Sequence, residues 1–237
     1  MKLGCRKLME RRLLTCCIFG LTIFVTSPTW AGTSLWDFED GAQIGDWKAA
    51  NGTWKIEDGF LKETSAAEKA AHILVGDVKW DDYTIEADIR IDSNKWAGLV
   101  FRAQNEFEYY MMYPEPTPGV TAFFRHLQGG FDQRDRPPPN KTAIQGLDIK
   151  VGEWFNMRIE VTGDKFVCFL NDIEQFEGTD PENKYKAGQV GVWAWETKAS
   201  FDNFTVVGGN VPDNAIFAVD PREKLTTTWA RMKQNFR

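Results

Sequence analysis

The clearest feature of the sequence is a regular alternation of apolar and polar residues. Between residues 83 and 91 every odd position is apolar or aromatic, and the even positions are Thr84, Glu86, Asp88 and Arg90. Residues 155–161 alternate in the same way. A period of two is typical of a β-strand that buries one face in a core and leaves the other in water. The sequence therefore predicts two half-buried strands here.

Short turn pairs separate the apolar runs. Asp58-Gly59, Gly163-Asp164 and Asn171-Asp172 each stand between two such runs, and residues that tolerate positive φ favour two-residue hairpins. Many short strands without an interleaved helical pattern indicate a two-sheet antiparallel sandwich or a barrel rather than an α/β fold. We expect further strands at residues 97–103, 107–113, 120–126, 188–195 and 200–207.

Three segments depart from this pattern. Residues 63–71, rich in Ala, Glu and Lys, are predicted to form a polar excursion rather than a helical turn. Residues 128–141 contain Gly-Gly and Pro-Pro-Pro, so we expect a long exposed loop that does not pair in a sheet and is either functional or mobile. After the last strand, residues 209–237 are predicted to be a linker followed by a short amphipathic helix at 224–236.

The first 31 residues have the features of a secretory signal. Five basic residues precede or lie near an almost purely apolar run at residues 13–25, Pro28 follows, and Thr29-Trp30-Ala31 places small residues at a cleavage site. The run is short for a membrane span, which needs ~20 residues. We therefore expect a secreted or periplasmic protein that is not membrane-bound after cleavage; a retained N-terminal anchor is the alternative.

Removing this segment changes the charge and the cysteine count. It contains five basic residues and one acidic residue, so a chain of formal net charge −6 becomes one of −10. An acidic protein repels phosphate backbones, which argues against a nucleic-acid partner. Cys5, Cys16 and Cys17 leave with the signal, and Cys168 stays alone in an apolar run. We expect a buried, unreactive thiol and no internal disulfide.

Several blocks resemble one known superfamily. Residues 36–41, 52–61 and 96–104 with Tyr109-Tyr110, followed by residues 188–195 and 201–206, are similar in order to the strands of laminarin-glucanase-like and LamG-like jelly rolls. The resemblance is to the concanavalin A-like lectins and glucanases, which include bacterial 3-keto-disaccharide hydrolase-type domains and fructan-binding modules. It implies one jelly-roll domain at residues 32–208.

That fold hosts lectins, glycosidases and adhesion domains, so the function has to be argued from a site. Sugars stack their C–H faces on aromatic rings and accept hydrogen bonds from guanidinium groups. We expect such a site for an oligo- or polysaccharide on the concave sheet. The alternative for the tryptophans is a core or scattered surface position. The candidate ligand-binding residues are Trp96, Arg102, Tyr110, Arg125, Trp193, Trp195 and Glu196.

A glycoside hydrolase acting on a keto-sugar is the second hypothesis, and an adhesion domain without a small ligand is the third. The resembling glucanases carry Glu-x-Asp-x-x-Glu on one strand, but here Glu86-Ala-Asp88 is followed by Ile91 in the third acidic position. A hydrolase would therefore need Glu108, Glu196 or a carboxylate from residues 128–141.

The same resemblance implies a structural calcium site. The glucanases place it where the first strand, here Glu39-Asp40-Gly41, meets an acid of the last strand, here Asp202. Calcium prefers carboxylate and backbone oxygens, so Glu39, Gly41 and Asp202 are the candidate ligands. His72 and His126 lack a suitably spaced companion and are predicted to be surface histidines.

Overall fold

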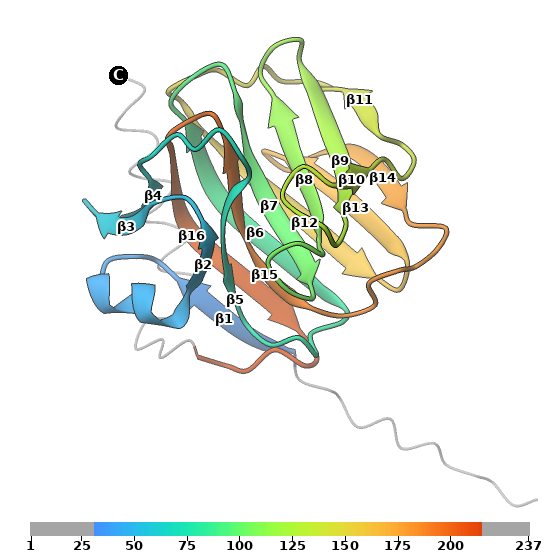
Figure 1. Cartoon of the computed structure of the whole chain (residues 1–237), viewed down its shortest axis with the longest axis horizontal. Coiled ribbons are helices and arrows are strands. Elements are labelled where there is room, and N and C mark those ends of the chain that lie inside the picture. Colours follow the sequence, from blue (N-terminus) through green and yellow to red (C-terminus); the bar gives the residue numbers. More distant parts are fainter. Residues whose placement is uncertain (1–30, 215–237) are drawn as a thin grey trace, which may run out of the picture.

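The computed structural model describes residues 31–214, which form two antiparallel sheets packed face to face (Figure 1). The predicted signal segment and C-terminal helix lie outside the described residues. Within them, the only helix is a 3-10 segment, η1 (Gly41–Asp46), whose N-cap Asp40 accepts a hydrogen bond from the Ala42 N–H. The all-β sandwich predicted from the alternation is confirmed. No helix in this part of the chain is long and apolar enough to cross a membrane.

The back sheet, which lies behind the other in Figure 1, has the strand order β14-β13-β12-β6-β16-β4-β3, and β1 also pairs with β16. Its long central strands come from the two alternating segments and from the end of the domain. Its strands are β1 (Gly32–Trp36), β3 (Trp54–Glu57), β4 (Phe60–Glu63), β6 (Tyr83–Ile91), β12 (Trp154–Thr162), β13 (Lys165–Leu170), β14 (Ile173–Thr179) and β16 (Ala199–Gly208).

The front sheet has the order β10-β9-β8-β7-β15-β5-β2, and β11 pairs with β9. Figure 1 shows β5, β7, β8, β9 and β15 in front of the back sheet. Its strands are β2 (Lys48–Asn51), β5 (Ala71–Val75), β7 (Trp96–Ala103), β8 (Tyr110–Glu115), β9 (Val120–His126), β10 (Arg134–Asp135), β11 (Lys141–Ala143) and β15 (Gln189–Trp195).

The alternation predicted for the back sheet is confirmed. In β6 the odd residues are buried and the even ones are half-buried, and β12 follows the same pattern opposite it. The buried side chains form the core between the sheets together with Cys168, which is a free thiol without solvent contact. The hairpin at Asn171 and Asp172, with φ of 47° and 63°, has the positive φ values that the sequence predicted.

The front sheet is buried on both faces. In β7, Leu99 and Phe101 point into the core between the sheets, while Val100 belongs to a second apolar cluster on the outer face. Every residue of β5 and β8 is buried. A strand that reads as a continuous apolar run, rather than an alternating one, is typical of a sheet that is covered twice. The cover on the outer side comes from the loops that join the strands.

The prediction for residues 128–141 is wrong in part. Arg134 and Asp135 pair with His126 and Arg125 as β10, and Lys141 to Ala143 pair with the other half of β9 as β11. The three prolines lie between these two short strands, so none of them interrupts a ladder. This is how an edge strand accommodates proline. Residues 64–70 have no regular structure, as predicted for the excursion.

The expected position of Arg102 on the outer face beside Tyr110 is also wrong. The backbone at Arg102 has φ of 50°, which forms a bulge at the end of β7. Its guanidinium is buried at the edge of the sandwich and donates to the carbonyl oxygens of Asp81 and Tyr185 at 3.1 and 3.2 Å. It also lies over the Phe166 ring, 5.4 Å from its centre. Arg102 therefore links the two loops that contain Asp81 and Tyr185 to strand β13, which contains Phe166.

We predict that Arg102→Ala lowers the free energy of unfolding by about 2–4 kcal/mol, because it leaves buried carbonyl oxygens without a donor. Chemical denaturation measures this loss. The matched control is Arg90→Ala, since Arg90 is only half-buried on the outer face of the back sheet and should cost less than about 1 kcal/mol. Equal stability of the two variants would contradict a structural role for Arg102.

Candidate functional site

The outer face of the front sheet carries a row of residues that lie side by side across the strands. Trp193 of β15 pairs with His72 of β5 on one side and with Gly98 of β7 on the other. Tyr113 of β8 lies beyond Gly98 and pairs with Ala122 of β9. The row combines the Trp193 and Tyr113 rings with the imidazole of His72. We call the Trp193 and Tyr113 rings, together with the neighbouring Phe124 ring, the aromatic floor of the outer face.

Gly98 makes this floor continuous. A Cβ at this position would lie 2.1 Å from the Met112 carbonyl oxygen and 2.7 Å from the Tyr113 Cβ, so only glycine fits. Without a side chain in between, the Trp193 and Tyr113 rings stack across β7 with centres 5.0 Å apart and planes 24° from parallel. Phe124 of β9 continues the stack at 5.9 Å from Tyr113.

Trp96 and Trp195 form the accessible rim of the floor. They pair with each other across β7 and β15, and their ring centres are 6.4 Å apart. Both are half-buried, whereas Trp193 beneath them is 1% exposed. Glu196 accepts a hydrogen bond from the Trp195 indole and forms an ion pair with Lys95. Four predicted residues, Trp96, Trp193, Trp195 and Glu196, are thus brought together.

Buried polar groups without partners lie at the other end of the floor. Tyr109 stacks on His126 with ring centres 4.4 Å apart and contacts His72 at 4.8 Å. Within residues 31–214, both ring nitrogens of His126 have no hydrogen-bond partner, whereas the Tyr109 hydroxyl and the Trp193 indole nitrogen interact only with each other, and His72 interacts with the backbone of Ala70 and Glu106. Groups of this kind are costly when buried alone, so they indicate a place where a polar ligand or water is bound.

The two histidines are neutral at physiological pH. Burial lowers the pKa of His72 to about 4. Burial, together with the charges of Arg134 and His72, lowers the pKa of His126 to about 3. The prediction that they are surface histidines is therefore wrong. Each lies on the outer face of a strand whose other face is in the core, and that face is itself covered.

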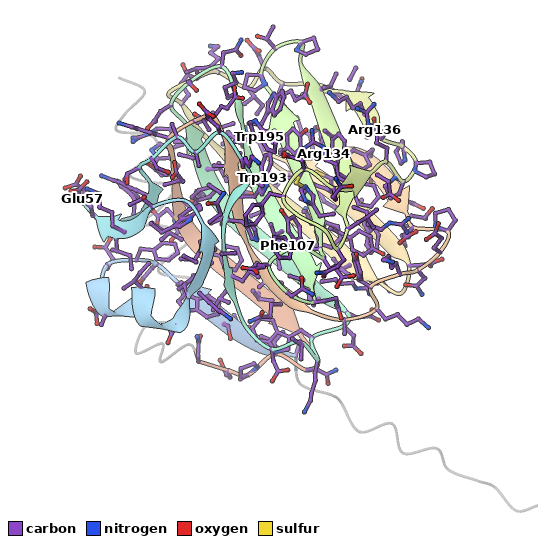
Figure 2. All side chains as sticks on the ribbon, viewed as in Figure 1. Glu57, Phe107, Arg134, Arg136, Trp193 and Trp195 are labelled. Atoms are coloured by element: carbon purple, nitrogen blue, oxygen red, sulfur yellow. The ribbon has the colours of Figure 1, made fainter. Side chains whose placement is uncertain are left out.

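Two segments, one containing Phe107 and one containing Phe131, cover the outer face of the front sheet. Phe107 contacts Phe131, and Phe131 contacts His72. Further along the second loop, the Arg134 guanidinium lies 5.0 Å from the Trp195 ring centre and 5.3 Å from that of Phe124. Figure 2 shows Trp195, Trp193 and Phe107 over the front sheet, with Arg134 and Arg136 beside them. The sequence singled out residues 128–141 as a segment of interest but did not identify these two arginines.

The remaining predicted binding residues lie elsewhere. Tyr110, the first residue of β8, points into the core between the sheets, because Tyr109 just before the strand takes the outward position. Its hydroxyl donates to Asp180, which also accepts two hydrogen bonds of 2.9 Å from Arg125. Burial alone would raise the pKa of Asp180, but these bonds and those from backbone N–H groups hold it below its ordinary value. Tyr110, Arg125 and Asp180 form a buried network at the edge of the sandwich.

The acids on the outer face of the front sheet do not form a catalytic pair. Hydrogen bonds from Lys95 and Trp195 lower the pKa of Glu196. Asp135 pairs with Arg125, and Glu108 accepts a hydrogen bond from Asn105. The lowered pKa of Glu196 is the opposite of what a carboxylic acid needs to donate a proton at neutral pH. A hydrolase that uses two carboxylates in this groove has no support from the geometry.

Of the candidate calcium ligands, only Asp202 lies on the back sheet, while Glu39 and Gly41 lie in the segment that follows β1. Asp202 is half-buried in β16; burial, with the nearby charges of Asp88, Glu39 and Asp37, raises its pKa to about 7. Gly41 begins η1 and is exposed, as is Glu39. Among residues 31–214, no three acidic, histidine or cysteine side chains converge closely enough to hold a metal ion. The side chains alone do not make a calcium site.

Comparison with solved structures shows the same fold in several proteins. A carbohydrate-binding module of family CBM66 from Bacillus subtilis has a TM-score of 0.58 and 22% identity, covering 68% of this chain and 94% of the module. A protein of unknown function with a galectin-like fold, also from Bacillus subtilis, has a TM-score of 0.55 and 12% identity, with 76% and 96% covered. The GH43 protein BlXynB from Bacillus licheniformis has a TM-score of 0.52 and 14% identity, with 73% and 39% covered.

At these identities the likeness establishes the fold alone, and it confirms the resemblance to concanavalin A-like jelly rolls. No curated protein matches the sequence significantly. The family model of the 3-keto-alpha-glucoside-1,2-lyase-like domain matches residues 32–207, which is most of the chain and includes both sheets. The chain therefore belongs to the 3-keto-alpha-glucoside-1,2-lyase-like domain family.

Proposed function

We propose that the domain recognises a carbohydrate on the outer face of its front sheet. The observation that carries this proposal is the aromatic floor of Trp193, Tyr113 and Phe124, which continues into the accessible rings of Trp96 and Trp195. Flat apolar rings bind the C–H faces of a sugar, and a few polar groups beside them fix its orientation. The fold shared with a carbohydrate-binding module supports the same proposal.

The exposed fraction of each ring indicates which residues would contact a bound sugar. Trp96 and Trp195 are half-buried and offer ring surface to a sugar, while Trp193 supports them from below at 6.0 Å from Trp195. An open hollow of about 640 Å³ elsewhere is lined by Gly76, Asp77, Lys79, Trp80, Asn210 and Pro212. Trp80 is its one aromatic residue, and that side chain is buried. We therefore favour the front sheet.

Trp195→Ala is expected to weaken glycan binding about tenfold or more, since it removes a stacking surface. A glycan array identifies the sugar and isothermal titration calorimetry measures the Kd. The control is Trp154→Ala, because Trp154 is 39% exposed on the back sheet and lies outside the site. Equal weakening by both substitutions, or no glycan bound by the wild type, would contradict the proposal; the second result favours an adhesion domain.

A second candidate function is the elimination reaction for which the family is named. In such a reaction a base removes the proton at C2, beside the ketone at C3, and the substituent at C1 leaves with the electron pair of its bond. The specific observation in its favour is the buried, neutral imidazole of His126, with both ring nitrogens free of partners. An imidazole with a pKa of about 3 is a weak base at neutral pH, so the pKa of His126 would have to rise on uncovering before it could accept the proton. The cover over His126 would have to shift to admit the substrate.

If this second function holds, the protein releases nitrophenol from nitrophenyl 3-keto-α-glucoside, and His126→Gln lowers kcat about a hundredfold, as loss of a general base does. Arg158→Gln on the back sheet serves as the control. Release at the wild-type rate by His126→Gln would exclude His126 as the base, and no release by the wild-type protein would leave binding as the function.

Calcium near Glu39, Gly41 and Asp202 remains a prediction, and Asp202→Asn tests it. The pKa of Asp202 is about 7 in the folded protein against an ordinary 3.8, so the folded state holds this proton more tightly. Stability should then fall as pH rises from about 4 to 7, and Asp202→Asn should flatten this dependence. A bound cation would offset the clustered negative charge above pH 7.

Thermal melts with calcium and with chelator, at pH 5 and at pH 8, provide the measurement. At pH 8, calcium at a hundredfold excess over its Kd is expected to stabilise the wild type by ~2.7 kcal/mol, and Asp202→Asn should lose that gain. If chelator leaves the melting temperature unchanged, the prediction of a calcium site is wrong. A variant that keeps the pH dependence of the wild type would show that Asp202 is not its source.

A further inference from the structure

Two arginines on the cover of the front sheet have no acidic partner. Residues 31–214 contain six arginines, and four of them form ion pairs with carboxylates. Arg134 and Arg136 are the exceptions: within these residues, neither makes an ion pair or a side-chain hydrogen bond. Their guanidinium groups lie over rings instead, Arg134 over Trp195 and Phe124, and Arg136 over Phe124 at 5.5 Å.

Several acids near the two arginines already have other partners. Glu108 accepts a hydrogen bond from Asn105, and four other carboxylates around this face are each paired with a cation. These pairs are Lys69–Asp132 at 3.4 Å, Arg125–Asp135 at 2.5 Å, Lys141–Glu115 at 2.6 Å and Lys95–Glu196. Arg125 also contacts Asp180 and Glu182, so it is not an excess of positive charge but the lack of a carboxylate partner within residues 31–214 that leaves the Arg134 and Arg136 guanidinium groups open to an anion.

A guanidinium that rests flat on an aromatic ring keeps its N–H edge free for an anion. This arrangement suits carboxylate and sulfate oxygens, which accept two parallel hydrogen bonds from the fork. The stacking also holds the side chain in place, so less conformational freedom is lost when the anion binds. Arg134 covers part of the Trp195 ring at 5.0 Å, so a sugar that contacts the parts of Trp96 and Trp195 still exposed lies beside the guanidinium and within its reach.

We infer that the carbohydrate recognised by the front sheet carries negative charge, as a uronate carboxylate or a sulfate ester, and that Arg134 and Arg136 bind this group. This inference rests on the proposed carbohydrate site and adds the class of ligand. A nucleic acid also offers anionic oxygens, but its continuous phosphate backbone would meet the acidic remainder of the surface. A glycan with isolated charged groups fits a site of only two guanidinium groups.

Two matched pairs of polysaccharides test the inference, because each pair differs only in charge. Dextran sulfate is compared with dextran, and polygalacturonate with its fully methyl-esterified form. The wild-type protein is expected to bind the charged member of at least one pair about tenfold or more tightly, as charge-assisted hydrogen bonds predict. The pair that shows the preference identifies sulfate or carboxylate as the group recognised.

The double variant Arg134→Gln/Arg136→Gln is expected to lose this preference while its affinity for the neutral member stays within about twofold. The control, Arg90→Gln/Arg158→Gln, removes the same charge from the back sheet and should keep the preference. A thermal melt of each variant confirms that it is folded. Polyglutamate, a polyanion without sugar, should bind weakly to all of them.

Three results would overturn the inference. Equal affinity of the wild type for charged and neutral members would show that charge is not recognised. Loss of the preference in the back-sheet control, or tight binding of polyglutamate, would show attraction to any polyanion. If Trp195→Ala still weakens binding of the neutral member when no charge preference exists, the carbohydrate site stands and only its ligand class is wrong. If no polysaccharide binds, both proposals fail.

Discussion

The front sheet carries apolar side chains on both of its faces, and much of the structure follows from the need to cover it twice. Its inner face packs on the back sheet around Leu99, Phe101 and their neighbours. Its outer face would expose Val100, Met111 and Trp193 to water if the loops did not fold over it, at a cost of roughly 25 cal/mol for each Å² of apolar surface. The segments around Phe107 and Phe131 supply that cover.

The aromatic, imidazole and guanidinium groups that could bind a ligand are concentrated on the covered outer face of the front sheet. Gly98 lets Trp193 and Tyr113 stack into one floor, and the same cover buries the imidazoles of His72 and His126. The unpaired Arg134 and Arg136 lie above the floor rather than within it. An aromatic surface, unpartnered polar groups and free cationic groups thus occur together on one face, which is the combination expected of a ligand site.

The sequence predicted the back sheet well because one face of its strands is exposed to solvent and the other is buried. Alternation in residues 83–91 and the turn at Asn171 depend on local chemistry, which a single sequence displays. The outer face of the front sheet was harder to predict, since a continuous apolar run does not say which residues point outward. The bulge at Arg102 and the outward position of Tyr109 rather than Tyr110 decide that question, and both depend on strand pairing. Trp193 and Trp195 were predicted to share a face because they alternate with the apolar Val192 and Ala194, and the pairing of β7 with β15 places Trp96 beside them.

The central claim is that a glycan binds the outer face of the front sheet, and NMR of the tryptophan indole N–H groups tests it most directly. The Nε1–H of Trp193 and the rim indoles of Trp96 and Trp195 report on this face, while Trp154 and Trp54 report on the back sheet. Single Trp→Phe variants assign the signals. Titration with the glycan is predicted to shift the signals of Trp96, Trp193 and Trp195 and to leave those of Trp154 and Trp54 in place. Shifts confined to Trp154 and Trp54 would contradict the account.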